Sequence, residues 1–174
     1  MPGTKDLTLL FSVRLLSAMG VTLILPVMPG MARAFGLTVA EAGLVVVCFT
    51  LAEATMTPIA GILSDRFGRK AILLPSLFVF AAGGILCLFA ETWREVLACR
   101  IIQGIGAGPL GVLYTILAAD MVDEAHLPRI MGRLTAVSSL GTIVYPIVGG
   151  LLGEWSWRAP FLVFTLALPT AFLS

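Results

Sequence analysis

The sequence predicts an all-α integral membrane protein with six transmembrane helices. Of its 174 residues, 59% are hydrophobic and only 12% are charged, and the apolar residues gather in long runs between short polar segments. Soluble domains carry about a quarter charged residues, so this composition leaves too few charges to cover a surface in water. The mean hydropathy of +1.03 agrees with that interpretation.

We expect a single six-helix domain over residues 1–174. The helices are expected at about 7–28, 43–63, 71–90, 96–119, 134–153 and 159–174. The first five runs have the roughly 20 residues that a bilayer core requires, and the sixth is about four residues shorter. Each run must be helical, because lipid offers the backbone no hydrogen-bond partner.

The basic residues of the loops predict an orientation. Six helices place both termini on one side, and that side carries Lys5, Arg66, Arg69, Lys70, Arg129 and Arg133. The other side carries Arg33, Arg94 and Arg158. Because short loops rich in Lys and Arg stay in the cytoplasm, we expect both termini to be cytoplasmic.

A weak internal repeat predicts how the six helices are arranged. Residues 60–69 align with residues 149–158 at an offset of 89 residues, which spans three helices. Both stretches close a helix with small and leucine-like residues and then turn through an acid to an arginine. An odd number of helices puts the copies on opposite faces, as in a three-plus-three inverted repeat. Because the match is short, chance similarity is the alternative.

The turn at residues 61–70 concentrates charge between two apolar runs. Its functional candidates are Gly61, Asp65, Arg66, Gly68, Arg69 and Lys70. We expect Gly61 to allow close helix approach and Gly68 to permit a tight reversal of the chain. Asp65 is able to accept hydrogen bonds from a helix N-terminus or an arginine. The alternative is a charged turn that only fixes the topology.

This turn reads G-I-L-S-D-R-F-G-R-K and resembles the G-x-L-x-D-R-x-G-R-K signature of the major facilitator superfamily. The start of the fourth run resembles the same superfamily's R-x-x-Q-G-x-G pattern. Residues 25–29 resemble the L-P-x-x-P of bacterial drug:proton antiporters and sugar-efflux relatives, and residues 157–161 resemble W-R-x-x-F. The resemblance implies the N-terminal half of a transporter in a bacterial-type plasma (inner) membrane, with the charged turn as a cytoplasmic gate.

The fourth run contains Arg100 and Gln103 beside Gly104 and Gly108. The glycines fall on one helix face and let a neighbouring backbone come close. Arg100 is interpreted as a cation that lines a cavity or influences a proton site, with Arg14 as a second candidate and Gln103 as a cavity-lining residue. The alternative for Arg100 is a side chain that extends to the headgroups.

The fifth run resembles an antiporter signature, G-x8-G-x3-G-P-x2-G-G. The matching positions are Gly132, Gly141, Pro146, Gly149 and Gly150. Tyr145 stands where the signature has glycine, and we interpret it as filling a groove or lining the cavity. The resemblance implies antiport, and the glycines have a helix-packing role in either case.

Glu53 lies near the middle of the second run, the depth at which a charge is most costly. Burial there favours the neutral carboxyl group, so Glu53 is our candidate for proton coupling. The alternative is a structural glutamate that is protonated or paired.

These observations favour half of a proton-coupled secondary transporter. We expect efflux antiport of a small molecule by alternating access, with membrane lipid, protons, the substrate and either a C-terminal half or a second copy as partners. The alternative is a non-transporting, truncated or engineered six-helix domain. The net charge of +1 does not suggest nucleic-acid binding, and Cys48, Cys87 and Cys99 lack metal-ligand spacing. We expect no enzyme activity, cofactor or metal.

Overall fold

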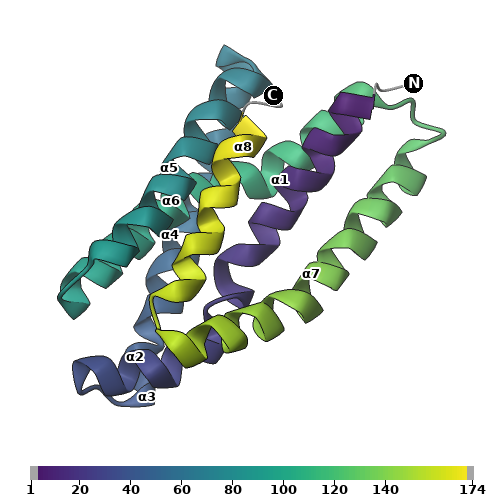
Figure 1. Ribbon diagram of the computed structural model, residues 1–174. Coiled ribbons are helices and arrows are strands. Elements are labelled where there is room, and N and C mark those ends of the chain that lie inside the picture. The colour runs from purple at the N-terminus through teal and green to yellow at the C-terminus, as the bar shows by residue number, and fades with distance from the viewer. Residues whose placement is uncertain (1–3, 172–174) are drawn as a thin grey trace.

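The computed structural model describes residues 4–171 and confirms the all-α fold class (Figure 1). All regular elements within this range are helical: α1 (Thr4–Thr22), η1 (Leu25–Val27), α2 (Met28–Phe35), α3 (Val39–Ala42), α4 (Leu44–Phe67), α5 (Arg69–Phe89), α6 (Trp93–Met121), α7 (Leu127–Trp155), η2 (Ala159–Leu166) and α8 (Ala167–Ala171). The predicted end of the sixth helix, residues 172–174, lies outside the described residues.

Within residues 4–171, five segments are long and apolar enough to cross a membrane. They are Leu7–Phe35, Val39–Phe67, Arg69–Phe89, Trp93–Met121 and Leu127–Trp155, and a shorter apolar helix covers Ala159–Thr170. Several extend beyond the predicted runs, because helical hydrogen bonding continues into the polar ends that hydropathy leaves out. The fifth, for example, begins at Leu127 rather than near residue 134, with a proline in its first turn where the missing N–H is no loss.

The first and second spans are bent near one end of the bundle. Pro26 lies in η1, which separates α1 from α2, and Pro29 lies in the first turn of α2. Gly36, in the left-handed region (φ 65°), ends α2. The second span restarts with a capping box, in which the Thr38 hydroxyl and the Glu41 carboxylate each accept a backbone N–H of the other residue. A matching box at Thr92 and Glu95 begins α6, so these helices start at fixed positions.

One part of the helix packing agrees with the predicted repeat. The two-fold relation of a three-plus-three repeat exchanges the first helix with the fourth and the second with the fifth, so it equates the pair α4–α6 with the pair α1–α7. Both pairs pack together in the structure. Each contact uses a glycine: Gly108 of α6 lies against the α4 backbone, and Gly149 of α7 lies against the carbonyl of Leu23.

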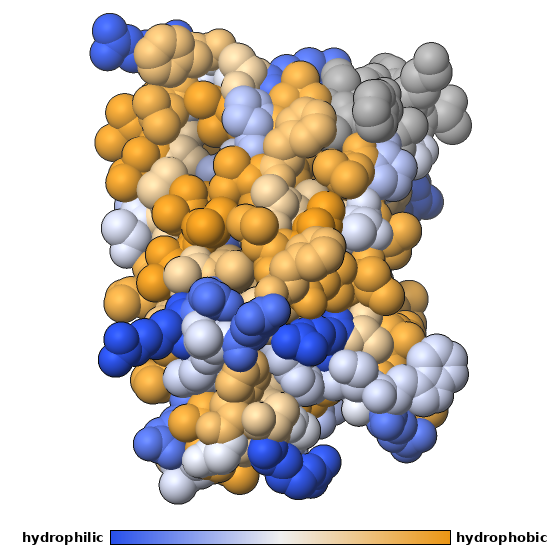
Figure 2. All heavy atoms as spheres, turned by 60° about the vertical axis from the view of Figure 1, so that its left-hand side comes forward, coloured by the Kyte–Doolittle hydropathy of each residue, from blue (hydrophilic) through white to orange (hydrophobic). Residues whose placement is uncertain are grey.

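The loops gather in two sets, one at each end of the bundle. The start of α1, the α4–α5 turn, the α6–α7 loop and the end of α8 lie at one end, while α2, α3 and the α7–η2 turn lie at the other (Figure 1). Hydrophobic residues cover much of the face in Figure 2, and hydrophilic residues gather mainly toward its lower end. Large apolar side chains stay exposed on this bundle, including Ile62 at 72% and Phe89 at 73%. Such a surface suits a lipid environment better than water.

Candidate functional site

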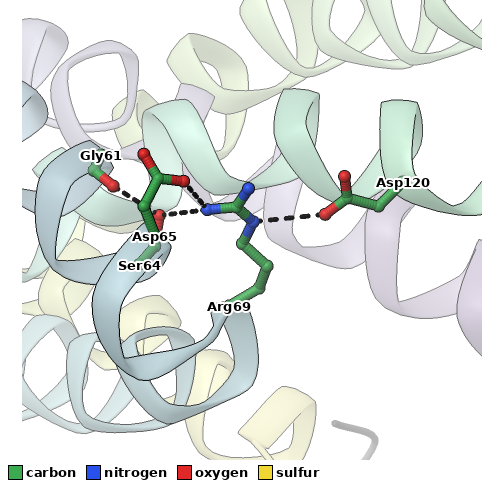
Figure 3. Close-up of polar contacts among 5 residues, drawn as sticks. All are labelled: Gly61, Ser64, Asp65, Arg69 and Asp120. Atoms are coloured by element: carbon green, nitrogen blue, oxygen red, sulfur yellow. Dashed lines mark hydrogen bonds and ion pairs between the residues drawn. The ribbon is translucent and has the colours of Figure 1, made fainter.

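The charged turn forms a compact cluster where α4, α5 and α6 end or begin. Gly68 separates α4 from α5 and has φ +93°, a backbone conformation that L side chains rarely adopt. This reversal places Arg69 at the first position of α5, directed back toward the last turns of α4 and α6 (Figure 3).

Arg69 joins three helices through its guanidinium. Its Nη1 donates to the carboxylate of Asp65 and to Ser64 Oγ at 3.0 Å, and its Nε donates to Asp120 Oδ2 at 3.2 Å (Figure 3). The Ser64 hydroxyl in turn donates to the Gly61 carbonyl at 2.8 Å. The two carboxylates remain 70% and 52% exposed, so solvent weakens these ion pairs. Ion pairs of this strength can form and break at a small cost in free energy.

The other predicted gate residues lie around this cluster on exposed surface. The Arg66 guanidinium lies 5.4 Å from the ring centroid of Phe67, and Lys70 is exposed at the start of α5. A Cβ at Gly61 would meet no described atom within 4 Å, so the close helix approach expected at Gly61 is not found among residues 4–171. The space beside Gly61 is open.

Arg100 lies in the interior of the bundle and is 0% exposed. Its Nε donates to the Val45 carbonyl of α4 at 3.2 Å, and its Nη2 donates to the Gly20 carbonyl of α1 at 2.7 Å. The guanidinium also lies 4.2 Å from the ring centroid of Phe49. Arg100 thus links α6 to α1 and α4 through buried contacts, and it does not extend to the headgroups.

Gln103 lies one turn further along α6 and is also fully buried. Its Oε1 accepts from Arg100 Nη1 at 2.5 Å. Its Nε2 has no hydrogen-bond partner among the described residues. Gln103 therefore does not face an open cavity in this structure, and it holds an unused donor inside the bundle.

Glu53 is half-buried on α4 and directed toward α1 and α6. Its Oε1 lies 3.7 Å from the position that a Cβ on Gly111 would occupy, as does the Ser17 hydroxyl oxygen. None of the described residues donates a hydrogen bond to this carboxylate, and the positive charge of Arg100 acts on it from inside the bundle. Glu53 is therefore an intramembrane acid without a direct partner within residues 4–171.

Arg14 and Tyr145 flank the same region from α1 and α7. The Arg14 guanidinium lies 4.7 Å from the ring centroid of Tyr114 on α6, and both side chains are half-buried. The Tyr145 hydroxyl donates to the Leu15 carbonyl at 3.2 Å, and its ring fills the space beside Gly141. Tyr145 thus ties α7 to α1.

The remaining motif glycines divide by what surrounds them. Gly104 and Gly108 meet the α4 backbone, and Gly149 meets the α1–η1 junction. A Cβ at Gly132 would meet nothing within 4 Å of described atoms, and one at Gly150 would only touch Pro26 at 3.8 Å. Pro146 lies half-buried within α7.

Sequence reasoning missed two members of the Arg69 cluster. Neither Asp120 nor Ser64 is among the candidate residues that the sequence predicts for this turn. Asp120 lies 51 residues from Arg69, so no local spacing indicates the pair. A helix-end acid opposite an arginine-rich turn is the one sequence signal that would have pointed to it.

A bundle of apolar helices with a buried arginine, a charged turn at one end and an intramembrane acid that has no hydrogen-bond donor among residues 4–171 defines a polytopic membrane protein. The Major Facilitator Superfamily model matches residues 10–173, and the chain belongs to that family. It is therefore a multi-pass membrane protein, and the relatives it matches are transporters rather than enzymes.

Two bacterial relatives have names that state a function. The chain is 33% identical over 164 residues to a bacillibactin exporter of Bacillus subtilis, covering 90% of this chain and 41% of that one. It is 29% identical over 157 residues to the quinolone resistance protein NorA of Staphylococcus aureus, covering 90% and 40%. The chain thus spans less than half the length of these relatives.

A solved structure has the same fold. The human organic anion transporter MFSD10 superposes with a TM-score of 0.74 at 22% identity, covering 99% of this chain and 47% of that chain. At this identity the likeness establishes the fold alone, which is that of part of a major facilitator transporter.

Proposed function

We propose that the chain is half of a proton-coupled exporter that works by alternating access. Export is supported by the relatives, one of which is named an exporter and another a quinolone resistance protein. Alternating access requires two halves that rock around a central site. A second half, or a second copy of this chain, is accordingly part of the proposal.

The uncovered helices support the need for a second half. Only 17% of the most apolar window is buried in each of the spans Val39–Phe67 and Leu127–Trp155, against 44–56% in the other three. These two spans are the least covered and are therefore the natural surfaces for a partner half. We assign the Arg69 cluster at the end of one of them to the gate that the two halves form.

Glu53 carries the proton-coupling part of the proposal. It is an intramembrane carboxyl group with no hydrogen-bond donor among the described residues, and intramembrane acids generally mark ion or proton pathways. Its position between α1, α4 and α6 lets it bind a proton on one side of the membrane and release it on the other. We further propose a bacterial inner membrane, with both termini in the cytoplasm.

Flux measurements in proteoliposomes test the proposal. The chain, alone and completed by a second half, is reconstituted with a pH-sensitive dye inside, and a quinolone or bacillibactin is added as the probe. We expect probe-dependent proton movement only from an assembly with two halves. Light scattering determines the number of chains in each assembly before reconstitution. Flux from a confirmed monomer would refute the two-half requirement. Absence of flux from every assembly would refute transport and favour a non-transporting domain.

A further inference from the structure

A second polar site lies away from Glu53 and from the Arg69 cluster. A cavity of about 230 Å³ opens between the start of α1, the end of α6 and the start of α7. Arg129, Arg133 and His126 line it, together with one acid, Asp123. Neither the family motifs nor the proposed gate uses these residues.

The two arginines of this cavity are not neutralised by any acid among the described residues. Arg129 and Arg133 are four residues apart on α7 and therefore share a face. Both are exposed, and neither forms an ion pair with another residue of the described chain, in contrast to Arg69. Asp123 is the only acid among the described residues of the wall, so the cavity favours an anion.

The other walls of the cavity are apolar, and their residues indicate how deep in the membrane the cavity lies. Leu7 begins the first membrane span, Met121 ends the fourth, and Ile130 lies in the first turn of the fifth. The cavity therefore crosses the boundary between the hydrocarbon-spanning helices and the polar loops. In a bilayer this is the level of the phosphate groups and the first carbons of the lipid tails.

We propose that this cavity binds an anionic phospholipid, with its phosphate between Arg129 and Arg133 and its glycerol and upper tail against Leu7, Met121 and Ile130. Guanidinium groups bind phosphate through paired N–H donors, and basic pockets between membrane helices bind lipid headgroups. The positive end of the α7 dipole adds to the attraction. This inference needs only the membrane location of the chain and is independent of transport.

Lipid binding to a charge-matched pair of variants tests the proposal. The chain is purified in mild detergent and titrated with phosphatidylglycerol or phosphatidylcholine, and bound lipid is counted by native mass spectrometry. Two cations near a phosphate contribute roughly a 30-fold difference in affinity. We expect Arg129→Gln/Arg133→Gln to weaken phosphatidylglycerol binding by that factor. The control Arg33→Gln/Arg94→Gln removes two exposed cations at the opposite end and should bind as the parent does.

Equal phosphatidylglycerol binding by the parent and both double variants would overturn the site. Asp123→Asn provides a measurement that does not depend on the arginine variants folding. Removing this acid from the wall should tighten phosphatidylglycerol binding several-fold. Unchanged or weaker binding by Asp123→Asn would also count against the proposal. Inorganic phosphate is titrated in parallel, and displacement of phosphatidylglycerol at millimolar phosphate would reassign the cavity to a soluble phosphate ligand.

Discussion

Replacing Gly108 by alanine should separate α4 from α6, whereas the same change one turn away at Gly111 should not. A Cβ at position 108 would lie 2.7 Å from the Glu53 carbonyl oxygen and 3.0 Å from the Thr57 backbone nitrogen. Both obstacles are backbone atoms, so α4 must move to admit the methyl group. At position 111 the nearest atoms are the Glu53 and Ser17 side-chain oxygens, both 3.7 Å away, which is ordinary van der Waals contact.

The pair of variants isolates the packing cost. Overpacking a filled interior costs about 1–3 kcal/mol. Both substitutions also remove a helical glycine, which by itself gains about 1 kcal/mol. We therefore expect Gly111→Ala to be neutral or stabilising and Gly108→Ala to be about 1–3 kcal/mol less stable than Gly111→Ala. Reversible unfolding in mixed micelles, followed by circular dichroism, measures the difference. Equal free energies of unfolding would show that α4 and α6 are not held at the observed distance.

Three further predictions concern topology, the gate and the proton site. In a background without native cysteines, Glu124→Cys in the α6–α7 loop should not react with an impermeant thiol reagent added to intact cells. Glu91→Cys in the α5–α6 loop should react. The reverse pattern would invert the proposed orientation. Asp120→Asn should leave the melting temperature nearly unchanged, because exposed ion pairs contribute little, yet impair flux in a complete assembly; wild-type flux would remove Asp120 from the gate. Glu53→Gln should retain probe binding and lose proton-driven flux, and undiminished coupling would exclude Glu53.

The sequence was sufficient for the fold because composition and run length are strong signals in a bilayer. Hydropathy located the apolar part of each span but not its ends. The start of α7 at Leu127 and the extension of the first span through Met28–Phe35 depend on helix continuation and capping in polar surroundings. The same limit applies to the restart of the second span at Thr38, which a Thr and Glu three residues apart indicate only weakly.

The site was predictable only where residues are close in the chain. The turn at residues 61–70 was evident, yet its bond to Asp120 joins residues that only helix packing brings together. The direction of Glu53 was also open, because α4 is apolar around most of its circumference and periodicity does not choose a face. The burial of Arg100 could not be derived, since it depends on the Val45 and Gly20 carbonyls, which lie 55 and 80 residues away in the chain.

The polar groups inside this bundle fall into two sets with different consequences for a rocking transporter. Arg100 and Tyr145 bond to backbone carbonyls of neighbouring helices, so their donors hold α1, α4, α6 and α7 together. Breaking such a bond in a water-poor interior leaves a polar group unpaired, which resists internal rearrangement. The Glu53 carboxylate and Gln103 Nε2 have no such partner among residues 4–171. The bonds of Arg100 and Tyr145 keep this half rigid, while the Glu53 carboxylate and Gln103 Nε2 stay free to bind a proton, a substrate or the other half. The proposed mechanism requires both properties.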